Sequence, residues 1–154
     1  MRHYSSYHWL LPLLLSLLFL PKLQAATLTG RVMNVPNGHQ ITLKSDEGQR
    51  LTIILAGIRN PSIAAGQPDI SQRHLHTLLA GRQVSVEFTA RSQGGAIIGR
   101  VLYGGADIAL RLLRSGLAEV TDEPALLAPA LLLHYQQAEQ SARLHGMGYW
   151  QSRQ

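Results

Sequence analysis

The chain has 154 residues, of which 45% are hydrophobic and 15% are charged. This length suits one domain of ordinary size, and the apolar content excludes an intrinsically disordered chain. There is no cysteine, which excludes disulfides, and the net charge of +5 permits a polyanionic partner without requiring one.

The first 25 residues predict a secretory signal peptide. A basic start containing Arg2 precedes a nearly unbroken apolar run, and small residues follow that allow cleavage, most simply after Ala25. The alternative is an uncleaved membrane anchor, but the run is shorter than the roughly 20 residues a spanning helix needs. We therefore expect a signal peptide at 1–25, a mature domain at 26–154 with a net charge of +3, and a periplasmic or secreted location.

Five strands are expected along the mature chain, because apolar runs alternate with turns rich in Gly, Asn and Asp. The strands cover residues 26–35, 39–45, 50–56, the run from Val84 to Phe88, and 96–103. Pro36-Asn37-Gly38 is expected to form the first turn, because proline fixes φ and because Asn and Gly tolerate positive φ. Residues 58–67, with Asn60-Pro61, are expected to form a loop.

Three helices are expected. The first begins near Asp69 or Ser71, either of which can cap it, and ends at Gly81. The second covers residues 107–115, and a long C-terminal helix covers about 126–144. Three strands, a helix, two strands and then helices predict an α+β fold: a small five-stranded β-barrel of the OB-fold type carrying about three helices.

Five segments of the sequence match segments of one known family, in the same order along the chain. They are Val35–Ile41, Leu55–Ser62, Gly99–Ile108, Leu112–Ala118 and Gly148–Trp150. The second reads Leu-Ala-Gly-Ile-Arg-Asn-Pro-Ser, where the family has Leu-Ala-Gly-Ile-Asp-Ala-Pro-Glu. With these segments the chain resembles the staphylococcal-nuclease-like (thermonuclease) family, whose fold is an OB-type barrel with helices.

The resemblance implies a calcium-dependent phosphodiesterase site built from two Asp, one Glu and two Arg side chains. The two Asp positions fall here on His39 and Arg59, the Glu position on Ser62, and the two Arg positions on Ile54 and Ala96. None of these positions keeps its chemistry, because calcium needs oxygen ligands and the phosphate clamp needs guanidinium groups. The resemblance thus implies a degenerate member of the family. We expect it to have no catalytic residues and to bind neither a metal nor a cofactor.

Three side chains are candidates for binding an anion without metal: His39, Arg59 and Arg100. The alternative for Arg59 is a loop arginine in solvent or paired with an acid, and for Arg100 a solvated strand residue. His74 and His76 lie two apart on a helix and point in different directions, which argues against a metal pair.

The sequence therefore favours an exported, catalytically inactive domain that acts as a binding or structural module for nucleic acid, another polyanion or a protein. The alternative is a nuclease with a rebuilt site, in which His39 acts as the base and Arg59 as the electrostatic clamp. No stable membrane span is expected after signal cleavage, and the oligomeric state stays open.

Overall fold

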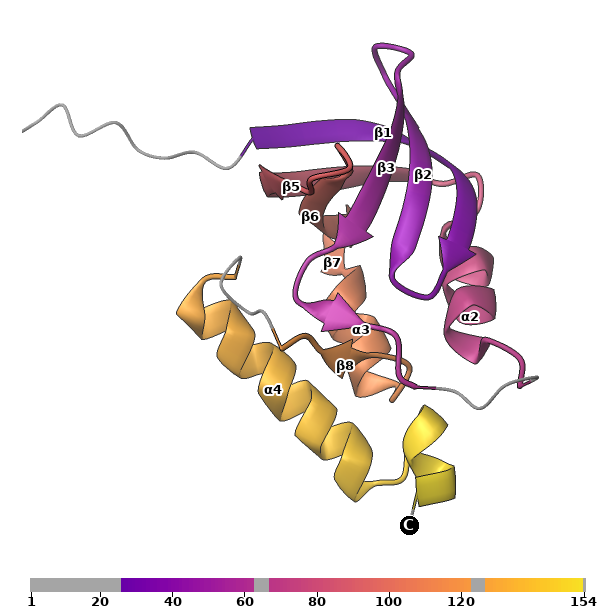
Figure 1. Cartoon of the computed structure of the whole chain (residues 1–154), viewed down its shortest axis with the longest axis vertical. Helices are drawn as coiled ribbons and strands as arrows, with labels where there is room; N and C mark the ends of the chain where they lie inside the picture. Colours follow the sequence, from indigo (N-terminus) through magenta and orange to yellow (C-terminus); the bar gives the residue numbers. More distant parts are fainter. Residues whose placement is uncertain (1–25, 63–66, 123–126, 154) are drawn as a thin grey trace, which may run out of the picture.

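The computed structural model describes residues 26–62, 67–122 and 127–153, shown in Figure 1. The predicted signal peptide at 1–25 lies outside the described residues. Within the described ranges, no helix is long and apolar enough to cross a membrane.

Five long strands close a barrel (Figure 1). They are β1 (Ala26–Asn37), β2 (Gln40–Ser45), β3 (Arg50–Leu55), β5 (Gln83–Arg91) and β6 (Ile97–Tyr103). The antiparallel order is β3-β2-β1-β5-β6, and a parallel pairing of β3 with β6 closes the ring. The predicted five-stranded OB-type barrel is therefore confirmed.

The core inside this barrel is formed by apolar side chains at every second position of the strands. Ile41 and Leu43 of β2 and Ile53 and Leu55 of β3 are all at most 1% exposed, while the residues between them face outward or are half-buried. Side chains two apart in a strand share a face, so each strand contributes one apolar row to the interior. Burial of these rows stabilises the barrel by roughly 1.5–3 kcal/mol per large side chain.

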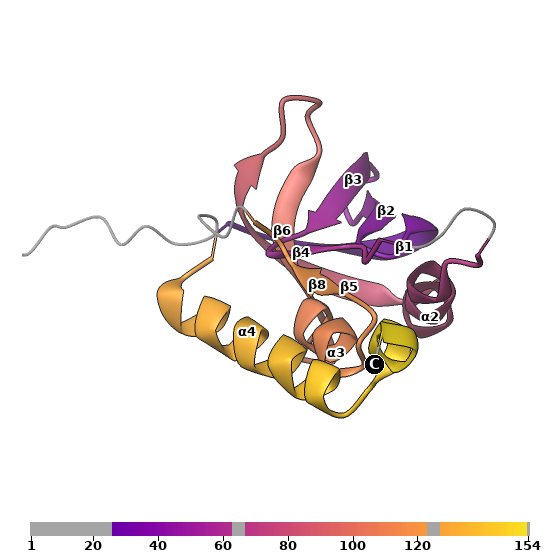
Figure 2. The same cartoon turned by 60° about the horizontal axis from the view of Figure 1, so that its bottom comes forward.

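Three helices accompany the barrel in the described part of the chain: α2 (Ile70–Leu79), α3 (Ile108–Arg114) and α4 (Pro129–Leu144). Figure 2 shows α3 between α4 and the barrel, with the C-terminal 3-10 helix η3 (Gly148–Arg153) close to α2. Asp69 caps α2 and Asp107 caps α3, each accepting a hydrogen bond from a backbone N–H of the first turn. The predicted helices, including the cap at Asp69, are confirmed.

In the described residues, one helix boundary differs from the prediction and three short strands are additional. The last helix begins at Pro129 and not near residue 126, because proline favours the first helical position and disfavours helix in the residue before it. The loop expected at 58–67 begins with a short strand, β4 (Ile58–Arg59), which pairs with β8 (Glu119–Val120). A further short strand, β7 (Ala106–Asp107), extends the sheet beside β6.

The first turn also differs from the prediction. Pro36 and Asn37 belong to β1, and the turn itself consists of Gly38 and His39. Gly38 does not have positive φ. It is needed for space: a Cβ placed there would lie 2.3 Å from the Cβ of Ser71 and 2.7 Å from Asn60 Oδ1. This glycine lets the turn pack directly on the start of α2.

Candidate functional site: the turn between β1 and β2

The turn between β1 and β2 presents His39 at the end of the barrel where β3 also finishes. The Asn37 side chain shapes the turn, since its Oδ1 accepts a hydrogen bond from the His39 backbone N–H at 3.1 Å. Leu55 N–H donates to the His39 carbonyl at 2.9 Å, which ties the turn to the end of β3. His39 is half-buried.

A chain of polar contacts holds the His39 ring. His39 Nδ1 lies 3.1 Å from Asn60 Oδ1, and Asn60 Nδ2 donates to Asp69 Oδ2 at 3.2 Å. A carboxylate only accepts hydrogen bonds, so the amide nitrogen of Asn60 must face Asp69 and its oxygen must face His39. His39 Nδ1 is therefore the donor, and in the neutral ring Nε2 carries the free lone pair.

Asp69 joins this chain to two helices. Its Oδ1 caps α2 by accepting from Gln72 N–H at 2.9 Å and also accepts from the Tyr149 hydroxyl at 3.4 Å. The same hydroxyl accepts from Ile70 N–H at 3.0 Å. The C-terminal 3-10 helix thereby fixes the start of α2, and through Asp69 and Asn60 it supports the orientation of His39.

Arg59 points away from this chain and forms ion pairs. Its Nη2 lies 2.9 Å from Glu119 Oε2 and its Nε lies 3.9 Å from Asp122 Oδ2. The Glu119 side chain is only 7% exposed, and the pairing of β4 with β8 sets it opposite Arg59. The alternative interpretation of Arg59, an arginine paired with a nearby acid, is confirmed.

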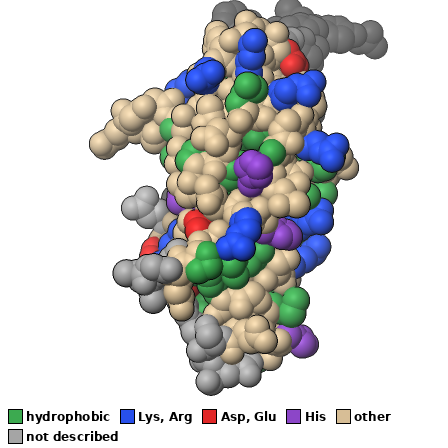
Figure 3. Space-filling model, turned by 90° about the vertical axis from the view of Figure 1, so that its right-hand side faces the viewer, with side chains coloured by type: hydrophobic (Ala, Val, Ile, Leu, Met, Phe, Trp, Pro, Cys, Tyr) green, Lys and Arg blue, Asp and Glu red, His purple; other side chains and the backbone are tan. Residues whose placement is uncertain are grey.

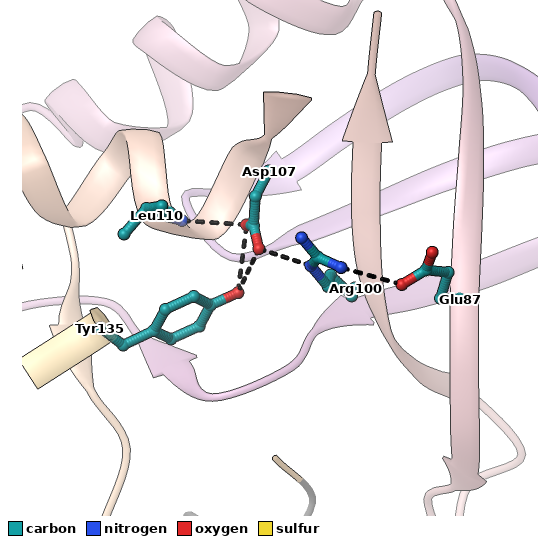
Figure 4. Close-up of polar contacts among 5 residues, drawn as sticks. All are labelled: Glu87, Arg100, Asp107, Leu110 and Tyr135. Carbon is teal, nitrogen blue, oxygen red and sulfur yellow. Dashed lines mark hydrogen bonds and ion pairs between the residues drawn. The ribbon is translucent and has the colours of Figure 1, made fainter. Parts of the chain in front are cut away.

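Arg100 belongs to a partly buried network and is not a solvated strand residue (Figure 4). Its Nε donates to Asp107 Oδ2 at 2.7 Å and its Nη1 to Glu87 Oε2 at 3.1 Å. Asp107 also accepts from the Tyr135 hydroxyl at 2.9 Å and from Leu110 N–H at 3.0 Å. The hydrogen bond with Asp107 raises the pKa of Arg100. The pKa of Tyr135 is also raised, mainly by burial and to a smaller extent by the negative charge of Asp107.

The family's catalytic positions gather only in part. Gln40, the neighbour of His39, pairs with Ile54 across β2 and β3, and β6 pairs alongside β3 with Ile98 opposite Ile54. Ala96 lies just before β6, where its N–H donates to Ser92 Oγ at 3.1 Å. Ser62 is exposed, two residues beyond Asn60. Among the described residues, no three His, Asp or Glu side chains converge as a metal site would require.

Asn60, Asp69 and Tyr149 are site residues that the sequence analysis missed. Asp69 was expected only as a helix cap and Asn60 only as part of a loop. Their roles depend on contacts between segments far apart in the sequence, so no local pattern could indicate them. One usable signal was the carboxamide at Asn60 where the family has alanine.

Comparison with known proteins matches residues 52–152 to the family described as "Staphylococcal nuclease homologue". The chain belongs to this family. A relative from Schizosaccharomyces pombe, "Staphylococcal nuclease domain-containing protein 1", is 29% identical over 153 residues. The alignment covers 87% of this chain and 17% of that relative, so the chain spans less than a fifth of the relative's length. The staphylococcal nuclease family resemblance drawn from the sequence is thereby confirmed.

Proposed function

We propose that this staphylococcal nuclease homologue binds nucleic acid and has lost the family's calcium-dependent hydrolysis. The observation that supports the loss of hydrolysis is the ion pair between Arg59 and Glu119. It puts a paired arginine on the position where the family uses a metal-binding carboxylate. His39, at the other such position, offers nitrogen instead of oxygen.

The chemistry of calcium supports this proposal. Calcium takes six to eight oxygen ligands, preferably carboxylates, and a guanidinium repels it. Ile54 and Ala96, at the positions of the phosphate-binding arginines, cannot stabilise charge that develops in a transition state. Removing such groups one at a time commonly costs orders of magnitude in rate, so removing all of them leaves no basis for the family's reaction.

Family membership and charge favour nucleic acid over the other candidate ligands, another polyanion or a protein. The chain from residue 26 onward carries a net charge of +3. Phosphate contacts from Lys and Arg supply most of the sequence-independent affinity for nucleic acid. We expect weak, salt-dependent and sequence-tolerant binding.

The test of the proposed function is incubation of the purified mature domain with labelled single-stranded DNA and RNA, in calcium and in chelator. The expected result is binding at low salt without calcium-dependent cleavage. Cleavage that needs calcium and co-purifies with the domain through successive columns would overturn the loss of hydrolysis. Absence of binding at low salt would remove nucleic acid as the ligand and favour another polyanion or a protein.

A second candidate function is a nuclease with a rebuilt, metal-independent site. The contact from Asp69 through Asn60 to His39 favours it, because it leaves His39 Nε2 as an oriented base. Against it, Arg59 is held by Glu119 and is poorly placed to act as a phosphate clamp. Cleavage in chelator that disappears in His39→Gln would establish this candidate, and cleavage unchanged in His39→Gln would identify a contaminant.

The proposed location is the periplasm or the cell exterior, based on the sequence of residues 1–25. Expression of the full chain in a bacterial host, followed by fractionation and intact-mass measurement, tests it. The expected product begins at Ala26. Full-length protein retained in the membrane fraction would instead indicate an uncleaved anchor.

A further inference from the structure

Three cationic side chains form a row across the outside of the barrel. In the strand register, Arg31 of β1 lies opposite Lys44 of β2, and Lys44 lies opposite Arg50 of β3. All three residues are exposed. Like charges placed directly opposite one another in a sheet repel and lower its stability. We call Arg31, Lys44 and Arg50 the cationic row.

The described acids form no ion pair with the row. Among the described residues, the ion pairs are made by Arg59, Arg100 and Arg143, and none includes the cationic row. The nearest acids in sequence are Asp46 and Glu47, in the turn between β2 and β3. Asp46 accepts hydrogen bonds from the Thr29 hydroxyl and from Gln83 Nε2, and Gln83 lies opposite Arg31 in the strand register. Its carboxylate therefore lies on the same outer face beside Arg31, at one edge of the row, without forming an ion pair with it.

The side chain of Arg31 is partly fixed. Its Nη1 donates to the Gly81 carbonyl at 3.0 Å, and the residue after Gly81 is the exposed Arg82. A carbonyl is neutral, so this bond holds the guanidinium without cancelling its charge. Figure 3 shows the side of the molecule with α2 and the end of β1, where Lys and Arg side chains (blue) are spread with few acidic atoms (red) between them.

A polar surface runs from the row to the turn that carries His39. Thr42 lies opposite Thr52 on the same outer face of β2 and β3, and Gln40 lies opposite Ile54 at the far end. Lys44 and Gln40 are four positions apart in β2, a distance of about 13 Å along the strand. The row is therefore a separate place from the family's catalytic positions, and its residues precede Thr52, where the family match begins.

We propose that the cationic row binds the phosphate backbone of a single-stranded nucleic acid. This proposal rests on the proposed function and names the surface that performs it. Neighbouring strands lie about 4.8 Å apart, so the backbone positions of the three residues extend over about 10 Å. The row is proposed to contact two or three phosphates of one nucleic-acid strand, with Arg31, which is bonded to the Gly81 carbonyl, at the β5 side of the row. The row and the threonines beside it offer no aromatic side chain for base stacking, so recognition is of the backbone and tolerates any sequence.

The test compares two double variants that remove the same charge. Lys44→Gln with Arg50→Gln removes two members of the row and leaves Arg31 with its bond to Gly81. Arg111→Gln with Arg114→Gln removes two exposed arginines of α3, which also make no ion pair among the described residues. The probe is a fluorescent single-stranded DNA of mixed sequence, titrated by anisotropy at several salt concentrations in chelator, with melting curves confirming that both variants fold.

The row variant is expected to bind about tenfold more weakly at low salt, and its slope of log K against log salt is expected to fall by about 1.4, since each phosphate contact contributes about 0.7. The α3 variant is expected to match the wild type in slope. Equal losses of DNA affinity in both variants, or a row variant that binds DNA like the wild type, would overturn the proposal that the row binds nucleic acid. Either result would leave the proposed function standing. Absence of wild-type binding would remove the proposed function itself.

Discussion

His39 Nδ1 lies 3.1 Å from Asn60 Oδ1, although the two residues are 21 positions apart in the sequence. Asn60 also donates to Asp69, so the carboxamide has one possible orientation and determines which His39 nitrogen carries the proton. At the position where the sequence resemblance implies a metal-binding carboxylate, this chain has an oriented imidazole.

Asn60→Ala is expected to remove the hydrogen bond that orients the His39 ring. The wild-type ring in its neutral form is expected to be protonated at Nδ1, and this preference is expected to disappear in the variant. Nitrogen chemical shifts of the His39 ring measure it directly. The free energy of unfolding should fall by only about 1 kcal/mol, because the half-exposed partners regain water. Asn34→Ala, on the exposed part of β1, is the control and is expected to change stability by less than about 0.5 kcal/mol.

Gly38→Ala is expected to destabilise the domain, because the new Cβ would overlap the Ser71 Cβ and Asn60 Oδ1. Forcing one carbon into a packed contact costs about 1–3 kcal/mol. Urea unfolding gives this value. Gly94→Ala is the matched control, since the nearest atom to its Cβ would be Ser92 Oγ at 3.9 Å. Similar stability of the two variants would contradict the close contact between the turn and α2.

Asp107→Asn is expected to be the most destabilising single polar change in the network of Figure 4. The Asp107 side chain is 5% exposed. Its replacement by a neutral amide would leave the Arg100 charge without its nearer ion-pair partner. Because Arg100 is 34% exposed, the expected cost is about 2–4 kcal/mol, below that of a fully buried pair. Glu87→Gln removes the outer partner, which is 38% exposed, and is expected to cost about 1 kcal/mol or less. Equal costs in urea unfolding would refute this ranking.

Tyr135 is expected to make stability depend on pH in the alkaline range. Burial first, and then the charge of Asp107, raise its pKa above the ordinary value of 10.0. The folded state therefore holds this proton more tightly than the unfolded state. Its contribution is fully present below pH 10 and is lost as pH rises further. The free energy of unfolding of the wild type should fall above about pH 10, and less steeply in Tyr135→Phe. A Tyr135 phenol that ionises near pH 10 in the folded protein would contradict this.

The barrel could be predicted from the sequence because its signals are local. Ile41 and Leu43 alternate with polar residues, residues 50–55 form a more continuously apolar run, and the turn at 46–49 separates two strands that pair as expected. Asp69 could be predicted as a cap because a side chain and the first turn of its own helix suffice. Such patterns need no knowledge of the rest of the fold.

The environment of the candidate residues could not be predicted in the same way. Arg59 finds Glu119 only because β4 pairs with β8, and two-residue strands leave no periodicity to read. Arg100 meets Asp107 because β6 turns back into β7. The sequence predicts Gly38 in a turn because glycine tolerates positive φ. The structure shows a different reason for glycine there, since a Cβ at this position would overlap the Ser71 side chain.

The measurement that tests the central claim most directly is the anisotropy of labelled single-stranded DNA, followed over time with the domain in calcium at low salt. Binding without hydrolysis predicts a rise in anisotropy that then stays constant and falls when salt is added. An absent rise would contradict nucleic-acid binding. A later decline below the value of free DNA, prevented by chelator, would contradict the loss of the family's reaction.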